Sequence, residues 1–591
     1  MKTTWKTTMA AAVLSISLMT SVSVLPAGAE GTESQATVIT VPSYTLNESL
    51  SVEVKGVSVS RTAEGLQLGA LIGLTNNGAA ITRVPDYELR IKTTEGIEYT
   101  LKANSANVKS VMAKENAELT YMVTVDRPGD TDISELSFVE VDEYTYPKTE
   151  TVVLNVPVSA NVWYGTKNQV ADPAANIAWG QPFTLPASTS PLRYTPVELT
   201  KQSDANGFTY LVTLLAENTG ANSENVPAFR LDGKAADKVY TGKRVEQEPV
   251  SLAAGEKKYV HFAITADQDV PLQSLLLMTT ETFVPGGAQP SQGVPAAGSG
   301  AAQPAGFDIG RLSITAPAPA APSNPGPSYT IGQPISFDPL NQLVSTTTEV
   351  SLVELHMHDN AGEGYKSVVA KFKLANKSDM TVATPAFQAQ LVGGDGSSYT
   401  GTRQTTAAAN MMPNLGYVVS YSFMIPASEN GNQLTIKLQD TTTAAPYSST
   451  IASFQAAVQQ DTEDAVMSFY PFTVKLDDWT IGSYTNPAAN GQGQTYSYKL
   501  KLWLNVERLE DVVVDPNFSK FKVELSDNLG RVLGSQTVPF TGENKLISGE
   551  QTIQFSNVRT EQLDYPLTVK LYESIDTPNG EATRLVKTLT Q

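Results

Sequence analysis

One segment recurs along this chain, and in it apolar side chains alternate with others up to an asparagine. Counting back by twos from Asn76, Asn218 and Asn376 gives Leu74, Ile72, Ala70 and Leu68; Ala216, Leu214, Val212 and Tyr210; and Leu374, Phe372, Ala370 and Val368. A period of two is that of a β-strand with one face on a core. A proline follows each asparagine nine positions later, and an aromatic residue stands two positions beyond it (Tyr87, Phe229 and Phe387). The identical spacing predicts three copies of one β domain.

The asparagines themselves are expected to serve the fold, because Asn at the end of a strand can bond its own chain in a turn. In the third copy, Lys371 and Lys373 alternate with Phe372 and Leu374, so both lysines are expected to face water. A diverged fourth copy alternates over 496–504, and in it Glu507 takes the place of the asparagine.

Six to eight short strands in about 120 residues, separated by turn signals, are typical of a β-sandwich. We therefore predict an all-β chain of tandem sandwiches. The predicted domains are 36–157, 158–284, 329–457 and 458–591, with a linker rich in proline, alanine and glycine at 285–328. Within that linker, residues 307–314 form either a strand that docks on the second domain or part of a flexible connection.

The N-terminus has the features of a secretory signal. Lys2 and Lys6 precede an uncharged apolar stretch at 9–26, and Ala27-Gly28-Ala29 provides a cleavage site. An uncleaved membrane anchor is the alternative. With residues 1–29 removed, no second long apolar stretch remains, so we expect a secreted chain without a membrane span, either free outside the cell or associated with the cell wall.

Composition excludes several classes of function. The 591 residues include 41 Lys+Arg against 60 Asp+Glu, and the net charge of −19 disfavours nucleic acid and anionic lipid as partners. The chain has no cysteine and three histidines, which excludes disulfides, thiolate nucleophiles and cysteine-bound metals and leaves little room for histidine chemistry. No cofactor is expected.

Further markers repeat beside the asparagine and the aromatic residue. They are Gly96 with Tyr99, Gly396 with Tyr399, Gly255-Glu256 and Gly549-Glu550. With these markers the repeat resembles the immunoglobulin-like domains of unknown function found in secreted and lipoprotein-anchored proteins of Gram-positive bacteria. The resemblance implies a sandwich fold and a location outside the cell, and it supplies no catalytic residues.

Candidate metal ligands are few. His356 and His358 lie on one face of a predicted strand, where Asp359 or Glu354 could complete a site, but two histidines without a third form a weak metal motif, so an ordinary strand is the stronger interpretation. His261 is expected to be a solvated strand residue rather than a catalytic base.

Carboxylate groupings also give a weak signal. The pairs Asp477-Asp478 and Glu510-Asp511 could be glycosidase-like, and Asp130, Asp132 and Glu135 could hold calcium in a loop. In so acidic a chain, solvated loops are the stronger interpretation of both.

Two tryptophans are candidate ligand contacts. Trp503 falls on the polar face of its strand and Trp479 follows two aspartates, so either could stack on a sugar or anchor a protein. A neighbouring domain could instead cover each of them.

These observations favour a non-enzymatic structural or adhesion-type interaction protein of the cell envelope, whose partner would be a cell-wall polymer or an envelope protein. One alternative is a carbohydrate- or peptidoglycan-binding protein that uses exposed aromatic residues. Another is an envelope enzyme with an unrecognised carboxylate pair, which would need two buried carboxylates converging in a cleft, whereas stacked sandwiches are expected to leave no catalytic cleft. The oligomeric state stays open.

Overall fold

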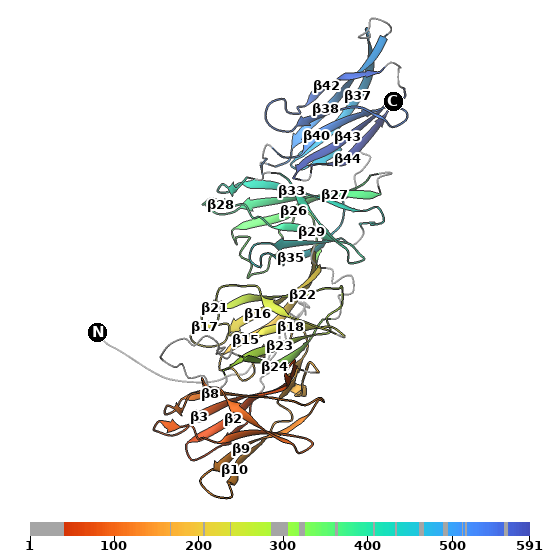
Figure 1. Cartoon of the computed structure of the whole chain (residues 1–591). Coiled ribbons are helices and arrows are strands. Elements are labelled where there is room, and N and C mark those ends of the chain that lie inside the picture. Colours follow the sequence, from red (N-terminus) through yellow and green to blue (C-terminus); the bar gives the residue numbers. More distant parts are fainter. Residues whose placement is uncertain are drawn as a thin grey trace, which may run out of the picture.

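The computed structural model is all-β, with domains stacked end to end into an elongated rod (Figure 1). It describes residues 41–165, 167–204, 207–236, 238–284, 305–317, 326–360, 364–405, 408–431, 434–459, 466–487, 494–510, 512–514, 517–560, 565–578 and 580–591. Within these ranges no α-helix occurs, and a single 3-10 turn covers Pro173–Ala175. None of the described segments is a helix long and apolar enough to cross a membrane. The predicted signal at 1–29 lies outside the described residues.

Domain one (41–171) lies at the N-terminal end of the rod. Its strands are β1 (Ser43–Thr45), β2 (Leu50–Thr62), β3 (Gly65–Asn76), β4 (Thr82–Arg83), β5 (Glu88–Thr93), β6 (Glu98–Ala103), β7 (Ser110–Val111), β8 (Asn116–Val125), β9 (Ile133–Asp142), β10 (Thr149–Pro157), β11 (Val162–Tyr164) and β12 (Gln169–Val170). They follow the order β10-β9-β5-β6-β8-β3-β2-β11-β12, in which β6 links the two layers, while β4 pairs with β7. Because β11 pairs with β2, domain one extends past the expected boundary at residue 157.

Domain two (172–317) is a sandwich of two five-stranded sheets, β14-β15-β16-β22-β20 and β13-β24-β23-β18-β19. Its strands are β13 (Asn176–Ile177), β14 (Phe183–Thr184), β15 (Leu192–Asp204), β16 (Gly207–Asn218), β17 (Glu224–Asn225), β18 (Arg230–Lys234), β19 (Val239–Tyr240), β20 (Gly242–Arg244), β21 (Ser251–Leu252), β22 (Lys257–Ala266), β23 (Ser274–Phe283) and β24 (Ala305–Thr315). Strand β24 pairs along the whole of β23. The expected linker at 285–328 therefore contains a strand of domain two, which is the first of the two alternatives for residues 307–314.

Domain three (326–459) repeats this plan, with sheets β26-β27-β33-β31 and β25-β35-β34-β29-β30. Its strands are β25 (Ser328–Tyr329), β26 (Thr348–Asn360), β27 (Tyr365–Asn376), β28 (Val382–Ala383), β29 (Gln388–Val392), β30 (Ser398–Thr400), β31 (Thr402–Arg403), β32 (Asn410–Met411), β33 (Gly416–Pro426), β34 (Thr435–Asp440) and β35 (Ser449–Ala456).

Domain four (466–591) has the sheets β36-β37-β38-β42 and β41-β40-β43-β44. Its strands are β36 (Val466–Phe469), β37 (Phe472–Pro487), β38 (Gln494–Arg508), β39 (Val512–Val513), β40 (Lys520–Ser526), β41 (Val532–Pro539), β42 (Gly549–Thr560), β43 (Thr568–Thr577) and β44 (Gly580–Thr590). The short β39 pairs with β33 of domain three, so the two domains share a ladder.

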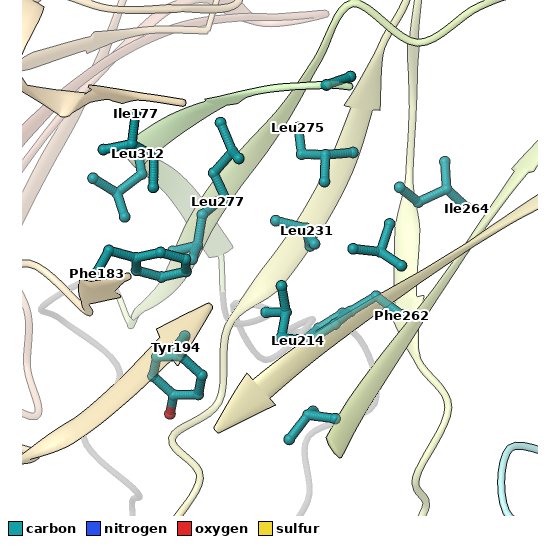
Figure 2. Packing of buried hydrophobic residues seen from close by; sticks show 14 of the residues in the cluster. Ile177, Phe183, Tyr194, Leu214, Leu231, Phe262, Ile264, Leu275, Leu277 and Leu312 are labelled. Carbon is teal, nitrogen blue, oxygen red and sulfur yellow. The ribbon is translucent and has the colours of Figure 1, made fainter. Parts of the chain in front are cut away.

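The predicted alternation is confirmed by the cores. In domain two, Val212, Leu214 and Ala216 are fully buried and meet side chains of the opposite sheet such as Leu231 and Leu277 (Figure 2). Each domain has a core cluster of this kind between its two sheets.

The repeated asparagines serve the fold, as expected. The side-chain amide of Asn218 donates to the carbonyls of Asn222 (2.7 Å) and Leu252 (2.9 Å), and its side-chain oxygen accepts the amide hydrogen of Gly220 (2.9 Å). Asn76 and Asn376 make the same three kinds of bond. One buried asparagine thus closes the turn after each of β3, β16 and β27.

Candidate functional site at the domain junctions

A β-bulge stands at the same place in the long hairpin of each of the first three domains. The cross-strand pair just beyond it points out of the sandwich, because its neighbours on the strand point into the core. These pairs are Gly56 with Leu71, Glu198 with Thr213, and Glu354 with Lys371. On the third strand they continue to Thr120, His261 and Ser420. We call each such row an outer row, and each faces the next domain of the rod.

Between domains one and two the cross-strand pair of the outer row, Gly56 with Leu71, carries no polar side chain. Leu71 packs in a buried cluster with Trp163, Phe307 and Ile309, of which the last two lie on β24. Gly69 lets the phenylalanine ring approach the sheet, since a Cβ at this position would lie 2.6 Å from Phe307. Burial of apolar side chains needs no hydrogen-bonding or charged partner. The close packing leaves little room for the two domains to move relative to each other.

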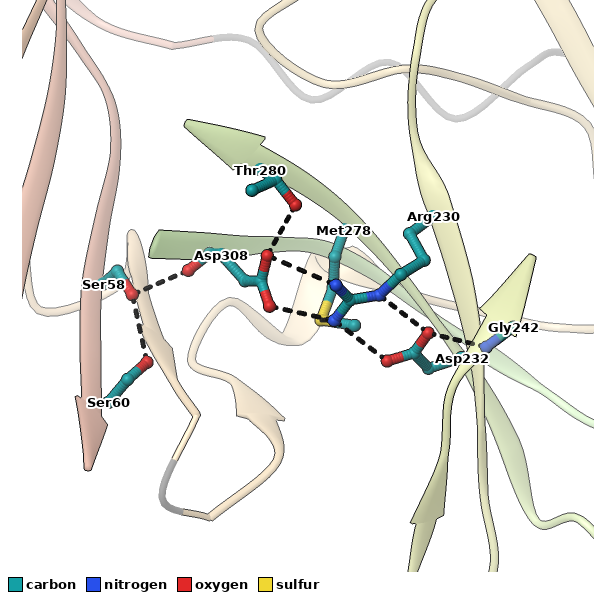
Figure 3. Close-up of polar contacts among 8 residues, drawn as sticks. All are labelled: Ser58, Ser60, Arg230, Asp232, Gly242, Met278, Thr280 and Asp308. Carbon is teal, nitrogen blue, oxygen red and sulfur yellow. Dashed lines mark hydrogen bonds and ion pairs between the residues drawn. The ribbon is translucent and has the colours of Figure 1, made fainter. Parts of the chain in front are cut away.

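Polar contacts border that apolar cluster. The hydroxyl of Ser58 donates to the carbonyl oxygen of Asp308 at 2.7 Å (Figure 3). The side chain of Asp308 pairs with Arg230 at 2.9 Å, and Arg230 also binds Asp232 (Figure 3). These contacts join β24 to β2 of domain one and to β18 of domain two.

Between domains three and four the outer row is charged. The ammonium of Lys371 lies 2.8 Å from Glu354 and 2.6 Å from Glu573 of domain four, and Glu573 lies 2.8 Å from Arg584. All four side chains are buried, so two cations and two carboxylates balance each other without water. The expectation that Lys371 faces water is wrong, because domain four covers that sheet face. Lys373 stays half-exposed and pairs with Glu510.

This environment shifts the acidity of the two glutamates. Burial alone would raise the pKa of the Glu354 carboxyl, but the charges of Lys371 and Arg584 outweigh burial and lower the pKa to about 2. The pKa of Glu573 is lowered against the effect of burial by the same two cations. Both carboxylates are therefore ionised at neutral pH.

Between domains two and three the outer row borders a cavity of about 650 Å³, lined by both domains. Two contacts join the domains beside it. The hydroxyl of Tyr259 donates to Asp338 at 2.5 Å, and Gln202 exchanges two hydrogen bonds with the backbone of Ser448 at 2.7 and 3.1 Å. Stacked sandwiches are expected to leave no catalytic cleft, and this junction nevertheless contains a cavity.

His261 lines this cavity and is buried, so the expectation that it is solvated is wrong. Its Nδ1 lies 2.8 Å from a carboxylate oxygen of Glu246, and that oxygen also accepts its backbone amide hydrogen at 2.9 Å. Burial opposes ionisation of Glu246, but hydrogen bonds from His261 lower the pKa of this carboxyl. The pKa of Glu198 moves the other way, because burial raises it and the neighbouring Thr450 offsets burial only in part.

The two predicted tryptophans lie in domain four on opposite faces of one sheet. Trp479 pairs with Leu502 and packs against the core, so a role in ligand contact has no support from its position. Trp503 pairs with Asp478 beyond a bulge that matches those of the other domains. Trp503 is therefore the outer-row residue of domain four, half-buried, with the ammonium of Lys501 5.9 Å from its ring centre.

The structure offers little support for a metal site at the histidine pair. His356 and His358 do share a strand face, but His356 is buried near the junction and Glu354 is held by Lys371. Over the described ranges, no three histidine or carboxylate side chains are grouped so that they could bind a metal ion.

Five of the other candidate carboxylates are paired with cations, and Asp511 lies outside the described residues. Asp130, Asp132 and Glu135 bind Arg61, Lys167 and Lys92 respectively, so these acids do not converge on one point. Glu510 binds Lys373 across the junction of domains three and four, and Asp477 binds Lys475.

Sequence reasoning missed the outer rows. A signal was present, since Leu71, Thr213 and Lys371 all stand five positions before a repeated asparagine. Their chemistry differs from apolar to polar to charged while the surrounding pattern is constant. Such variation at one fixed outward position indicates contact with different neighbours.

No protein-family model and no curated protein matches the chain. Among solved structures, dimeric latent PorU from Porphyromonas gingivalis is similar at 11% identity, with a TM-score of 0.13. The match covers 68% of this chain and 34% of the PorU chain, and at that score it carries no argument. The fold by itself defines the class: a tandem β-sandwich protein.

Proposed function

We propose that the chain is an exported, non-enzymatic structural or interaction protein of the cell envelope, built of four immunoglobulin-like sandwiches. One observation carries the proposal: all three junctions of the rod use the same sheet position of one domain to receive the next. Domains repeated head to tail in this way hold their ends apart, which is what a spacer or a docking scaffold requires.

The outer row of domain four is the proposed partner contact. In the three preceding domains this row faces the next sandwich, whereas in domain four it leaves Trp503 half-buried between Asp478 and Glu550. A tryptophan with charged neighbours is a common anchor in protein interfaces. The contact would be with an envelope protein.

A carbohydrate-binding role is the second candidate. The observation that favours it is that Trp503 and Tyr484 lie on the same outer face, because they pair with Asp478 and Ser497 along one ladder. Aromatic rings on a flat sheet face can stack on sugar rings. The cell-wall polymer would then be the ligand.

Retention of the full chain on isolated cell wall and on extracted envelope proteins tests both candidates. Trp503→Ala should reduce retention on one of the two fractions, and that fraction identifies the partner class. Tyr144→Ala, which removes a fully exposed aromatic at the opposite end of the rod, is the matched control and should change nothing. Equal retention of the Trp503 variant and the unmodified chain on both fractions would refute the contact.

A further inference from the structure

The cavity between domains two and three is bordered by the same sheet positions that form the charged network between domains three and four. At the latter, the outer row supplies Glu354 and Lys371. At the former, the equivalent cross-strand pair is Glu198 with Thr213. The carboxylate is kept, and a threonine stands where the lysine would be.

The opposing sheets show the same change. In domain four, the second cross-strand pair beyond the bulge between β43 and β44 is Glu573 with Arg584. In domain three, the second pair beyond the corresponding bulge between β34 and β35 is Asp440 with Ser449. Again the carboxylate is kept, and a serine replaces the cation.

The junction of domains two and three therefore retains both carboxylates of the network and neither cation. Glu198, Thr213, Asp440 and Ser449 all line the cavity of about 650 Å³. Two lysines also line it, but Lys257 pairs with Glu217 at 3.2 Å and Lys258 with Glu256 at 3.0 Å. No described lysine or arginine forms an ion pair with Glu198, on which the charges of Lys437 and of His261 act from a greater distance.

A second observation also points to a ligand. The hydroxyl of Thr213 is buried, lines the cavity, and has no hydrogen-bond partner among the described residues. A buried polar group without a partner is unfavourable unless another molecule completes its bonding. The ring of Tyr259 also belongs to the lining, and a tyrosine ring can attract a cation.

We propose that this cleft binds a small organic dication, whose two ammonium or guanidinium groups take the places that Lys371 and Arg584 occupy at the next junction. Glu198 provides the main ion pair, since Asp440 already accepts hydrogen bonds from Thr442 and Thr443 and contributes mainly its charge. The volume is in the range of ordinary small-molecule sites.

Calorimetric titration of the full chain with cadaverine, an aliphatic diamine, tests the proposal. Cadaverine should bind at one site, and pentanediol, which replaces both ammonium groups by hydroxyls, should not bind. Glu198→Gln should weaken cadaverine binding by about tenfold or more, which corresponds to about 1.4 kcal/mol. Asp267→Asn removes an exposed carboxylate elsewhere in domain two and should leave binding unchanged.

A second variant tests the equivalence of the two junctions directly. Thr213→Lys combined with Ser449→Arg restores the missing cations, so it should abolish cadaverine binding and raise the unfolding temperature. If the double variant fails to fold, Thr213→Lys alone serves as the test, and it should already weaken cadaverine binding. Three results would each overturn the proposal. They are binding of pentanediol as tight as that of cadaverine, binding of calcium as tight as that of cadaverine, and unchanged binding of cadaverine by the Glu198→Gln variant. None of these outcomes depends on whether Trp503 contacts a partner.

Discussion

Replacement of Lys371 by methionine isolates the buried charges between domains three and four. The side chains are similar in length, so the change removes the charge with little change in volume. In the unmodified chain the ammonium contacts Glu354 at 2.8 Å and Glu573 at 2.6 Å, with all three groups out of reach of water. The substitution leaves two carboxylates facing Arg584 alone, so the site acquires a net negative charge.

Loss of one member of a buried ion pair destabilises by about 3–5 kcal/mol, because the remaining charge stays desolvated. Domains three and four unfold together if this junction couples them. For a unit of this size, each kcal/mol lowers the unfolding temperature by about 2–4 °C, so we expect a decrease of roughly 6–20 °C.

Differential scanning calorimetry of the full chain measures the effect. Lys373→Met is the matched control, since this lysine is two residues away and its ion pair with Glu510 is half-exposed. Its loss should change stability by about 1 kcal/mol or less. If the Lys371 and Lys373 variants unfold at the same temperature, the buried network does not stabilise the junction and our argument is wrong.

Other perturbations give further expected outcomes. Acidification should destabilise domains three and four, because the pKa of Glu354 lies at about 2 in the fold against an ordinary value of 4.5. The contribution of Glu354 to the free energy of unfolding is complete above pH 4.5 and is lost as the pH falls towards 2. Circular dichroism at decreasing pH can follow this loss. Gly310→Ala should destabilise by about 1–3 kcal/mol in guanidinium titrations, since the added Cβ would lie 2.2 Å from the Trp163 ring, and an unchanged midpoint would contradict the close packing. Asn218→Ala should lose about 1–3 kcal/mol in the same assay, because buried backbone groups lose their partner, whereas Asn222→Ala removes only an exposed side chain and should not.

The sandwich cores could be predicted from sequence because their cause is local. Strand residues alternate between two environments, and Leu214 or Phe372 shows the inward one by its own chemistry. The asparagine turns belong to the same class, since Asn218 bonds with backbone near it in the fold and the spacing repeats. Strand β24 was harder to predict, because about twenty residues separate it from its partner β23.

The outward faces could not be predicted in the same way. A lysine between Phe372 and Leu374 looks the same in the sequence whether water or domain four covers it. Glu573, which neutralises Lys371, lies about two hundred residues further along the chain. Likewise the burial of His261 depends on Glu246 and on domain three, and neither is signalled by the residues next to it. Local pattern predicts the inside of each sandwich, and contact between sandwiches depends on residues far apart.

The three junctions also differ in how firmly they can hold the rod. An apolar cluster and a neutral ion network fill the first and third, whereas the middle junction encloses a cavity and a carboxylate without an ion-pair partner among the described residues. Bending of the rod should therefore concentrate between domains two and three. A dication that contacts both domains would bind more tightly when they lie close together than when they are bent apart. Its binding would therefore stiffen the rod at the junction of domains two and three. The same site that recognises the cation would then set the distance between the ends of the protein.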